Sequence, residues 1–174
     1  MSEKIDLTKK SAFEILQLNA STLIELEKRK LIRTRNNPTG DFAEFLFKQT
    51  FDWQLTKNSV KGVDATLLDP IINKVIKYQI KSRKLNFNNA GERQLSAIRN
   101  LNNNQFDYLA VVLFNQDYSI YIGAIIPIGI VKNPKYSRFV EHTNSHTFHA
   151  TDKVFQLPEV KDVTNDLKRT LSLI

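Results

Sequence analysis

The chain has 174 residues, of which 41% are hydrophobic, so it can bury the core of one domain. The net charge of +7 sits mainly in the first half, with 16 basic against 10 acidic residues through Ala90 and 9 against 8 afterwards. The absence of cysteine excludes disulfides, zinc–thiolate sites and cysteine nucleophiles. With no secretory signal pattern and no apolar stretch long enough to span a bilayer, we expect a cytoplasmic protein without a membrane partner.

The first predicted element is an amphipathic helix. Ser11 followed by Glu14 is typical of a capping box, and an apolar stripe runs from Phe13 to Leu23, so we expect a helix that ends near Leu31. A break at residues 20–23 would instead give a helix-turn-helix, but a single helix fits the pattern better. We assign residues 1–36 to an N-terminal helical extension and residues 37–174 to one compact domain.

A second helix should follow the basic, turn-rich connector at residues 33–40. The sequence Gly40-Asp41-Phe42-Ala43-Glu44-Phe45-Leu46 is apolar on several sides, which predicts a helix buried against a sheet. Burial of this helix would carry Glu44 towards the sheet. Because Glu44 stands three residues after Asp41, its carboxylate could instead complete a capping box. A short first strand is expected near Trp53.

A β-hairpin is predicted next. Residues 62–68 and 75–83 alternate or run apolar, and Asp69-Pro70 between them is turn chemistry. If the turn occupies residues 69–74, Leu68 pairs with Val75, and counting back places Asp64 opposite Gln79. Cross-strand neighbours have Cβ atoms ~5 Å apart, so Asp64 and Gln79 could share one cation.

The remainder completes an α/β pattern. We expect a helix over residues 93–101, then strands over 108–114 and 119–126, then a helix from about Val160. The strand over 108–114 is apolar throughout, which predicts a central strand covered on both faces. Three histidines, His142, His146 and His149, lack the pattern of a zinc site and are interpreted as ordinary side chains.

Three side chains of the hairpin suggest metal-assisted phosphodiester chemistry. Asp64 offers a carboxylate, Gln79 an amide oxygen and Lys81 an ammonium on one face of the paired strands. Mg²⁺ prefers oxygen ligands and tolerates a neutral amide among them. A lysine beside the ion can stabilise the charge that develops on a phosphate in the transition state.

The order Asp64, then Gln79-Ile80-Lys81, resembles the D…QxK motif of the Mrr-type branch of the PD-(D/E)xK, or restriction-endonuclease-like, nuclease superfamily. The stretches GDFAEFL, NSVKGVDAT and YQIKSRKL are also similar to a family of small, uncharacterised bacterial proteins with this core. The resemblance covers Asn37 to about Leu113, and it implies a restriction-endonuclease-like mixed central sheet flanked by helices for the domain of residues 37–174.

The same resemblance implies the site and the reaction. Asp64, Glu44, Gln79 and the backbone carbonyl of Ile80 would hold Mg²⁺, with Mn²⁺ as an alternative, and Lys81 would contact the attacking water and the scissile phosphate. The implied activity is an endonuclease that hydrolyses DNA through a metal-activated water. Gln79 replaces the commoner carboxylate, so metal binding should be weaker.

Basic residues near the motif are candidates for phosphate contacts. Arg83 and Lys84 follow Lys81 directly, and more distant candidates are Lys57, Lys61, Arg35 and Arg93, together with Arg33 and Arg99. Two alternatives remain open: a catalytically inactive DNA-binding module on the same fold, and an RNA-directed nuclease. Cutting both strands of a duplex usually needs two copies of a small domain, so a homodimer is expected.

Overall fold

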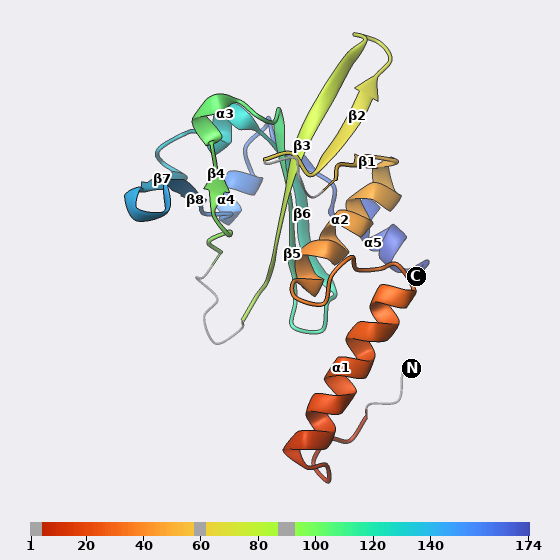
Figure 1. The fold of residues 1–174 in the computed structure, drawn as a ribbon. Helices are drawn as coiled ribbons and strands as arrows, with labels where there is room; N and C mark the ends of the chain where they lie inside the picture. The colour runs from red at the N-terminus through yellow and green to blue at the C-terminus, as the bar shows by residue number, and fades with distance from the viewer. Residues whose placement is uncertain (1–4, 58–61, 87–92) are drawn as a thin grey trace.

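A computed structural model of the chain describes residues 5–57, 62–86 and 93–174, and contains two β-sheets (Figure 1). The larger sheet has the strand order β1-β2-β3-β5-β6-β9 and the smaller one β4-β8-β7. The strands are β1 (Gln54–Leu55), β2 (Ala65–Asp69), β3 (Lys74–Lys84), β4 (Ile98–Arg99), β5 (Tyr108–Phe114), β6 (Ile120–Pro127), β7 (Ser137–Val140), β8 (Ser145–Phe148) and β9 (Lys161–Asp162). The helices are α1 (Ala12–Lys28), α2 (Pro38–Phe51), α3 (Ile128–Val131), α4 (Asp152–Phe155) and α5 (Thr164–Leu171), with 3-10 turns η2 (Leu101–Asn103) and η3 (Glu141–Thr143).

The large sheet is the middle layer of the body. Helices α2 and α5 cover one face, and the small sheet with α3 and α4 lies on the other (Figure 1). Strand β5 contributes alternate side chains to both cores, with Ala110 and Val112 on the α2 side and Leu109 and Val111 on the other. The predicted class, a mixed α/β sheet flanked by helices with an N-terminal helix, is confirmed, as is the central position of β5.

The predicted pairing of Leu68 with Val75 is confirmed, but regular pairing ends at Ala65 and Tyr78, so the predicted pairing of Asp64 with Gln79 is not among the strand pairs. Strands β2 and β3 are antiparallel, with Leu68 opposite Val75 and Ala65 opposite Tyr78. Strand β3 also pairs with β5, in the parallel sense, from Tyr78 to Lys84. Beyond Tyr78, therefore, β3 pairs within the described residues only with β5, and its other edge has no strand beside it.

The helix predicted over residues 93–101 is wrong. This segment forms a bridge between Gln94 and His149, then the short strand β4, which pairs with β8. Asn100 adopts a left-handed conformation, with φ 55°, which ends any helical path. Leu95 and Ile98 are nevertheless buried, because the small sheet covers the large one with the same apolar side chains. The helical spacing was a coincidence of core-facing positions.

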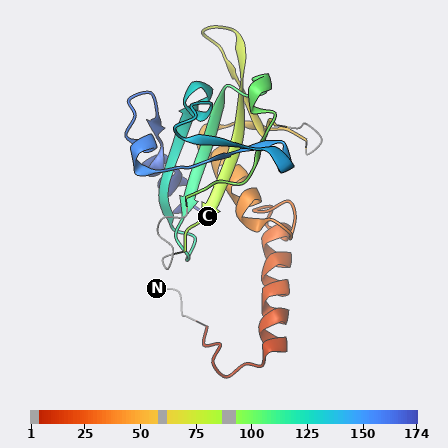
Figure 2. The ribbon, with the colours of Figure 1, turned by 90° about the vertical axis from the view of Figure 1, so that its left-hand side faces the viewer.

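Helix α1 stands apart from the body (Figures 1 and 2). Its capping box is present, since the Glu14 amide donates to the Ser11 hydroxyl and the Ser11 amide donates to the Glu14 carboxylate. The helix runs unbroken to Lys28, so the helix-turn-helix alternative is wrong and the predicted end near Leu31 is three residues too late. None of its residues is buried.

The C-terminal part differs from expectation in one boundary. Helix α5 begins at Thr164 rather than near Val160, because residues 161–162 first pair with β6 as strand β9.

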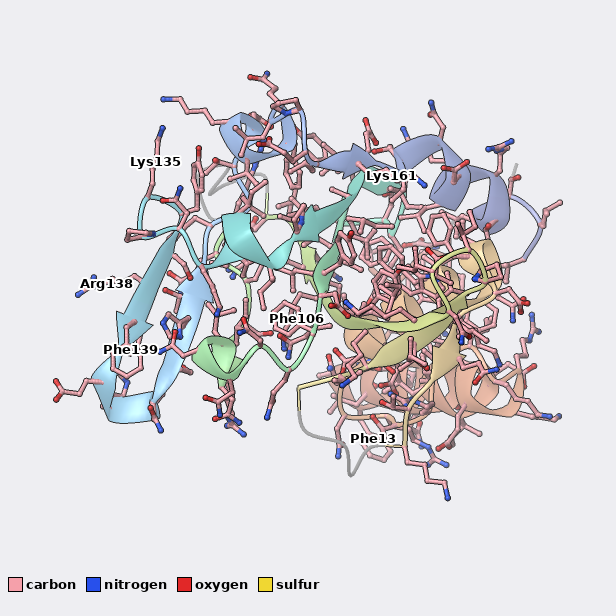
Figure 3. The ribbon with its side chains drawn as sticks, turned by 90° about the horizontal axis from the view of Figure 1, so that it is seen from above. Phe13, Phe106, Lys135, Arg138, Phe139 and Lys161 are labelled. Atoms are coloured by element: carbon pink, nitrogen blue, oxygen red, sulfur yellow. The ribbon has the colours of Figure 1, made fainter. Side chains whose placement is uncertain are left out.

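Seen from above, Phe106 lies inside the body, whereas Arg138 and Phe139 of β7 lie at the outer edge of the small sheet (Figure 3). Within the described ranges, no helix is long and apolar enough to cross a membrane.

Candidate active site

The candidate site lies where β2 separates from β3. The Asp64 amide still donates to the Tyr78 carbonyl, at 2.8 Å, but the chain before it turns away towards β1. The Asp64 carboxylate then accepts a hydrogen bond from the Ile80 amide, at 2.7 Å, and so replaces the carbonyl that a continuing strand would supply. Because the N–H and C=O of one strand residue point to the same edge, the Ile80 carbonyl also faces this opening.

Helix α2 brings Glu44 to the same opening. Asn37 is the N-cap of α2, and its side chain accepts from the Gly40 amide, so Glu44 lies in the second turn and does not cap the helix. The capping interpretation of Glu44 is therefore wrong. The Ser82 hydroxyl donates to the Thr39 carbonyl at 3.1 Å, which fastens the first turn of α2 to β3.

An arginine from the connector is paired with Glu44. The guanidinium of Arg33 forms an ion pair with the Glu44 carboxylate. The amides of Arg33 and Thr34 both donate to the Asp41 carboxylate, so a side chain of α2 fixes the connector backbone that presents Arg33. Arg33 is 36% exposed and Glu44 14%, so the pair lies at the border between solvent and the protein interior.

Two adjoining hollows meet at the two carboxylates. The first hollow, of 280 Å³, is lined by Arg33 and Lys57 together with Glu44 and Asp64. The second, of 360 Å³, is lined by the same two acids with Ile80, Lys81 and Ser82 among others. Glu44 and Asp64 border both. The fold thus brings Glu44 of α2, Lys81 of β3 and Asp64 to one polar opening, although they are far apart in sequence.

Burial changes the proton affinity of the charged groups here. It raises the pKa of Glu44 to about 7, with Arg33 opposing the shift and the negative charges of Asp64 and Asp41 adding to it. Burial also raises the pKa of Asp64, against the Ile80 amide and Lys81. For Lys81, burial lowers the pKa, while Asp64 and Glu44 favour the charged form. Such shifted groups in an opening are typical of functional sites.

Gln79 is placed differently from the other motif residues. The paired register ends at Ala65 and Tyr78, so Gln79 is not a strand partner of Asp64, and it is 6% exposed and not among the residues that line the two hollows. Its Oε1 is buried, and no partner for it is found among the described residues. A buried amide oxygen without a partner in the described ranges, on the residue before Ile80, is compatible with a ligand role, which stays a prediction.

The predicted phosphate-binding residues fall into two groups. Lys57 lines the first hollow, and Lys61 lies outside the described residues. The others have protein partners elsewhere: Arg83 donates to the Gln94 carbonyl, Lys84 lies over the Tyr118 ring, Arg35 pairs with Glu27, and Arg93 pairs with Asp152. Of the described candidates, Lys57 and Arg33 are those that adjoin the two carboxylates.

Two contributions to the site were not predicted from sequence. Asp41 was interpreted only as a capping residue, although it anchors the connector. Arg33 was a secondary phosphate candidate, and its pairing with Glu44 was missed. The spacing of eleven residues between Arg33 and Glu44 carries no signal, because the two meet only after the connector folds back on α2.

The donor set fits Mg²⁺. Glu44, Asp64 and Ile80 border one opening, and carboxylate and carbonyl oxygens are the kind of ligand that Mg²⁺ prefers. Within the described part of the chain no group of three or more His, Asp or Glu side chains is arranged for a metal, and the predicted set contains only two such residues. Comparison with protein-family models gives no match, and neither does comparison with curated proteins.

Proposed function

We propose that the protein is a metal-dependent endonuclease that hydrolyses phosphodiester bonds of DNA. One observation carries the proposal: Glu44, Asp64, Ile80 and Lys81 border a single hollow at the place where β2 leaves β3. The resemblance of the D…QxK motif to restriction-endonuclease-like nucleases supports the same activity.

Each residue of the hollow has a chemical task in this proposal. Glu44 and Asp64 would hold Mg²⁺, with the Ile80 carbonyl and Gln79 as neutral ligands, and the ion would polarise the phosphate and acidify a water. Asp64 is oriented by the Ile80 amide, so its ligand oxygen is fixed by the backbone. Lys81 is partly buried beside both acids, where an ammonium stabilises negative charge more strongly than it would in water.

The surroundings of the hollow favour a polyanionic substrate. Arg33 and Lys57 line the first hollow beside the carboxylates, and the chain carries a net charge of +7. A cation held by Glu44 would compete with Arg33 for this carboxylate. A guanidinium freed from Glu44 would lie at the mouth of the site, where it could donate to two phosphate oxygens as a bidentate partner.

An inactive DNA-binding module is the second candidate. It is favoured by two features: the neutral Gln79 lies outside the lining of both hollows, and Glu44 is already neutralised by Arg33. Both features would weaken metal binding without removing the basic entrance.

Digestion of plasmid DNA and of matched DNA and RNA oligonucleotides tests the proposal. We expect cleavage with Mg²⁺ or Mn²⁺ and none with EDTA, and loss of cleavage with retained binding in Asp64→Asn and Lys81→Met. Lys77→Met is the matched control, because Lys77 lies on the same strand but is exposed. Binding without cleavage in any metal favours the inactive module, and cleavage confined to RNA favours the RNA-directed nuclease.

A further inference from the structure

Helix α1 exposes a large apolar surface. Phe13 is 68% exposed, Leu16 65% and Ile24 47%, and Ile15 and Leu18 are also exposed. None of the 17 residues of α1 is buried, and a helix of this length with so little tertiary packing is only marginally stable in water. A helix that is apolar on several sides normally has a covering partner.

One face of α1 is continuous from the tip of the helix to its base. At 3.6 residues per turn, this face, here called the α1 stripe, contains Ile15, Leu16, Asn19, Thr22, Leu23 and Leu26. The stripe carries no charged residue. A strongly charged partner such as nucleic acid would therefore find no complementary charge on it, whereas a second neutral face would match it.

An apolar groove lies at the base of the same face. The groove measures 660 Å³, and the later part of the α1 stripe, from Asn19 to Leu26, forms one of its walls. The other walls come from the body and include Phe42, Leu171 and Ile174. Each chain thus carries both an apolar helix tip and an apolar groove that runs along the same helix face.

We propose that the α1 stripe pairs antiparallel with the α1 stripe of a second copy of the chain, about a two-fold axis near Asn19, so that the tip of each helix enters the groove of the other. In this register Ile15 faces Leu23 of the second copy, and Leu16 faces Thr22. Asn19 meets its own counterpart, and an asparagine pair in an apolar seam is a known device for fixing register. The surface is self-complementary, as a two-fold interface requires.

The buried area supports the inclusion of the groove. A helix of 17 residues is about 25 Å long, so the pairing of two such helices alone makes only a short contact strip about 10 Å wide. A stable interface buries roughly 800 Å² from each partner. Helix pairing alone is therefore too small, while the antiparallel arrangement adds a filled groove at both ends.

Molecular mass in solution, measured by light scattering on the full chain, tests the assembly. We expect a dimer for the wild type and a monomer for Leu16→Glu. Gln17→Glu is the matched control, because it adds the same charge on the opposite side of the helix, and it should leave the dimer intact. A monomeric wild type at micromolar concentration overturns the proposal, as does a dimer that both variants leave unchanged.

The absence of cysteine allows a second test, by site-specific cross-linking at the proposed axis. Asn19→Cys should form an intermolecular disulfide on mild oxidation, because residue 19 lies beside its own copy at the axis. Ser21→Cys, on the opposite face, should not. Equal cross-linking of the two variants overturns the register. Neither measurement involves nucleic acid, so the result stands whether or not the protein is a nuclease.

Discussion

Glu44 should make the folded protein less stable as the pH rises, and Glu44→Gln should abolish this effect. Burial raises the pKa of Glu44 from 4.5 to about 7. Since the folded state then holds a proton that the unfolded state has lost, the stability contributed by Glu44 is fully present below pH 4.5 and is lost as the pH rises through 7. A glutamine resembles the protonated acid in size and charge, so it keeps that contribution at every pH.

The structure sets the size of the effect. A shift from 4.5 to about 7 corresponds to about 3 kcal/mol of folding free energy above pH 7. This figure already includes the opposing influence of Arg33, and the Glu44 side chain is only 14% exposed, so solvent screening reduces it little. For a chain of 174 residues, a gain of 3 kcal/mol in Glu44→Gln over the wild type above pH 7 raises the melting temperature by roughly 6–12 °C.

The assay is urea unfolding of the wild type and Glu44→Gln at pH 4.5, 6 and 8 without divalent metal. The two should be nearly equal at pH 4.5, and the variant should be more stable by up to about 3 kcal/mol at pH 8. Glu27→Gln is the control, because Glu27 also pairs with an arginine but its side chain is 37% exposed, against 14% for Glu44. A difference between wild type and Glu44→Gln that does not change with pH would refute the reasoning.

Three further predictions have defined outcomes. Arg33→Gln should raise Mg²⁺ affinity about fivefold in titration calorimetry, since it removes a competing ion pair of about 1 kcal/mol, and an unchanged affinity would show that Arg33 does not compete. Gln79→Met should stabilise the fold by about 1 kcal/mol, because a buried unpartnered oxygen is removed, and should weaken Mg²⁺ binding if Gln79 is a ligand. Leu46→Ala should cost about 2–5 kcal/mol in urea unfolding because Leu46 is fully buried, whereas the exposed Leu68→Ala should change stability by less than about 0.5 kcal/mol, and similar losses for both would contradict the described core.

The sequence determined the elements whose signals are local. The period of two in the strand at residues 74–84, and the length of the turn before it, were enough to set Leu68 opposite Val75. The capping box at Ser11 likewise predicted the start of α1, and the continuous apolar run predicted the central strand β5. In each case residues close together in the sequence are enough to predict the element, because backbone periodicity and turn chemistry act over a few positions.

Only the tertiary structure decided how the site is assembled. Leu95 and Ile98 have helical spacing, yet pairing with β8 makes their segment extended, since backbone hydrogen bonds to a neighbouring strand override local preference. The sequence allowed Glu44 to be either a helix cap or a site residue, and the N-cap at Asn37 removed the first option. The pairing of Arg33 with Glu44, and the exposure of the apolar face of α1, depend on how the connector and the helix leave the body. Contacts of this kind join residues through space, and no spacing along the chain encodes them.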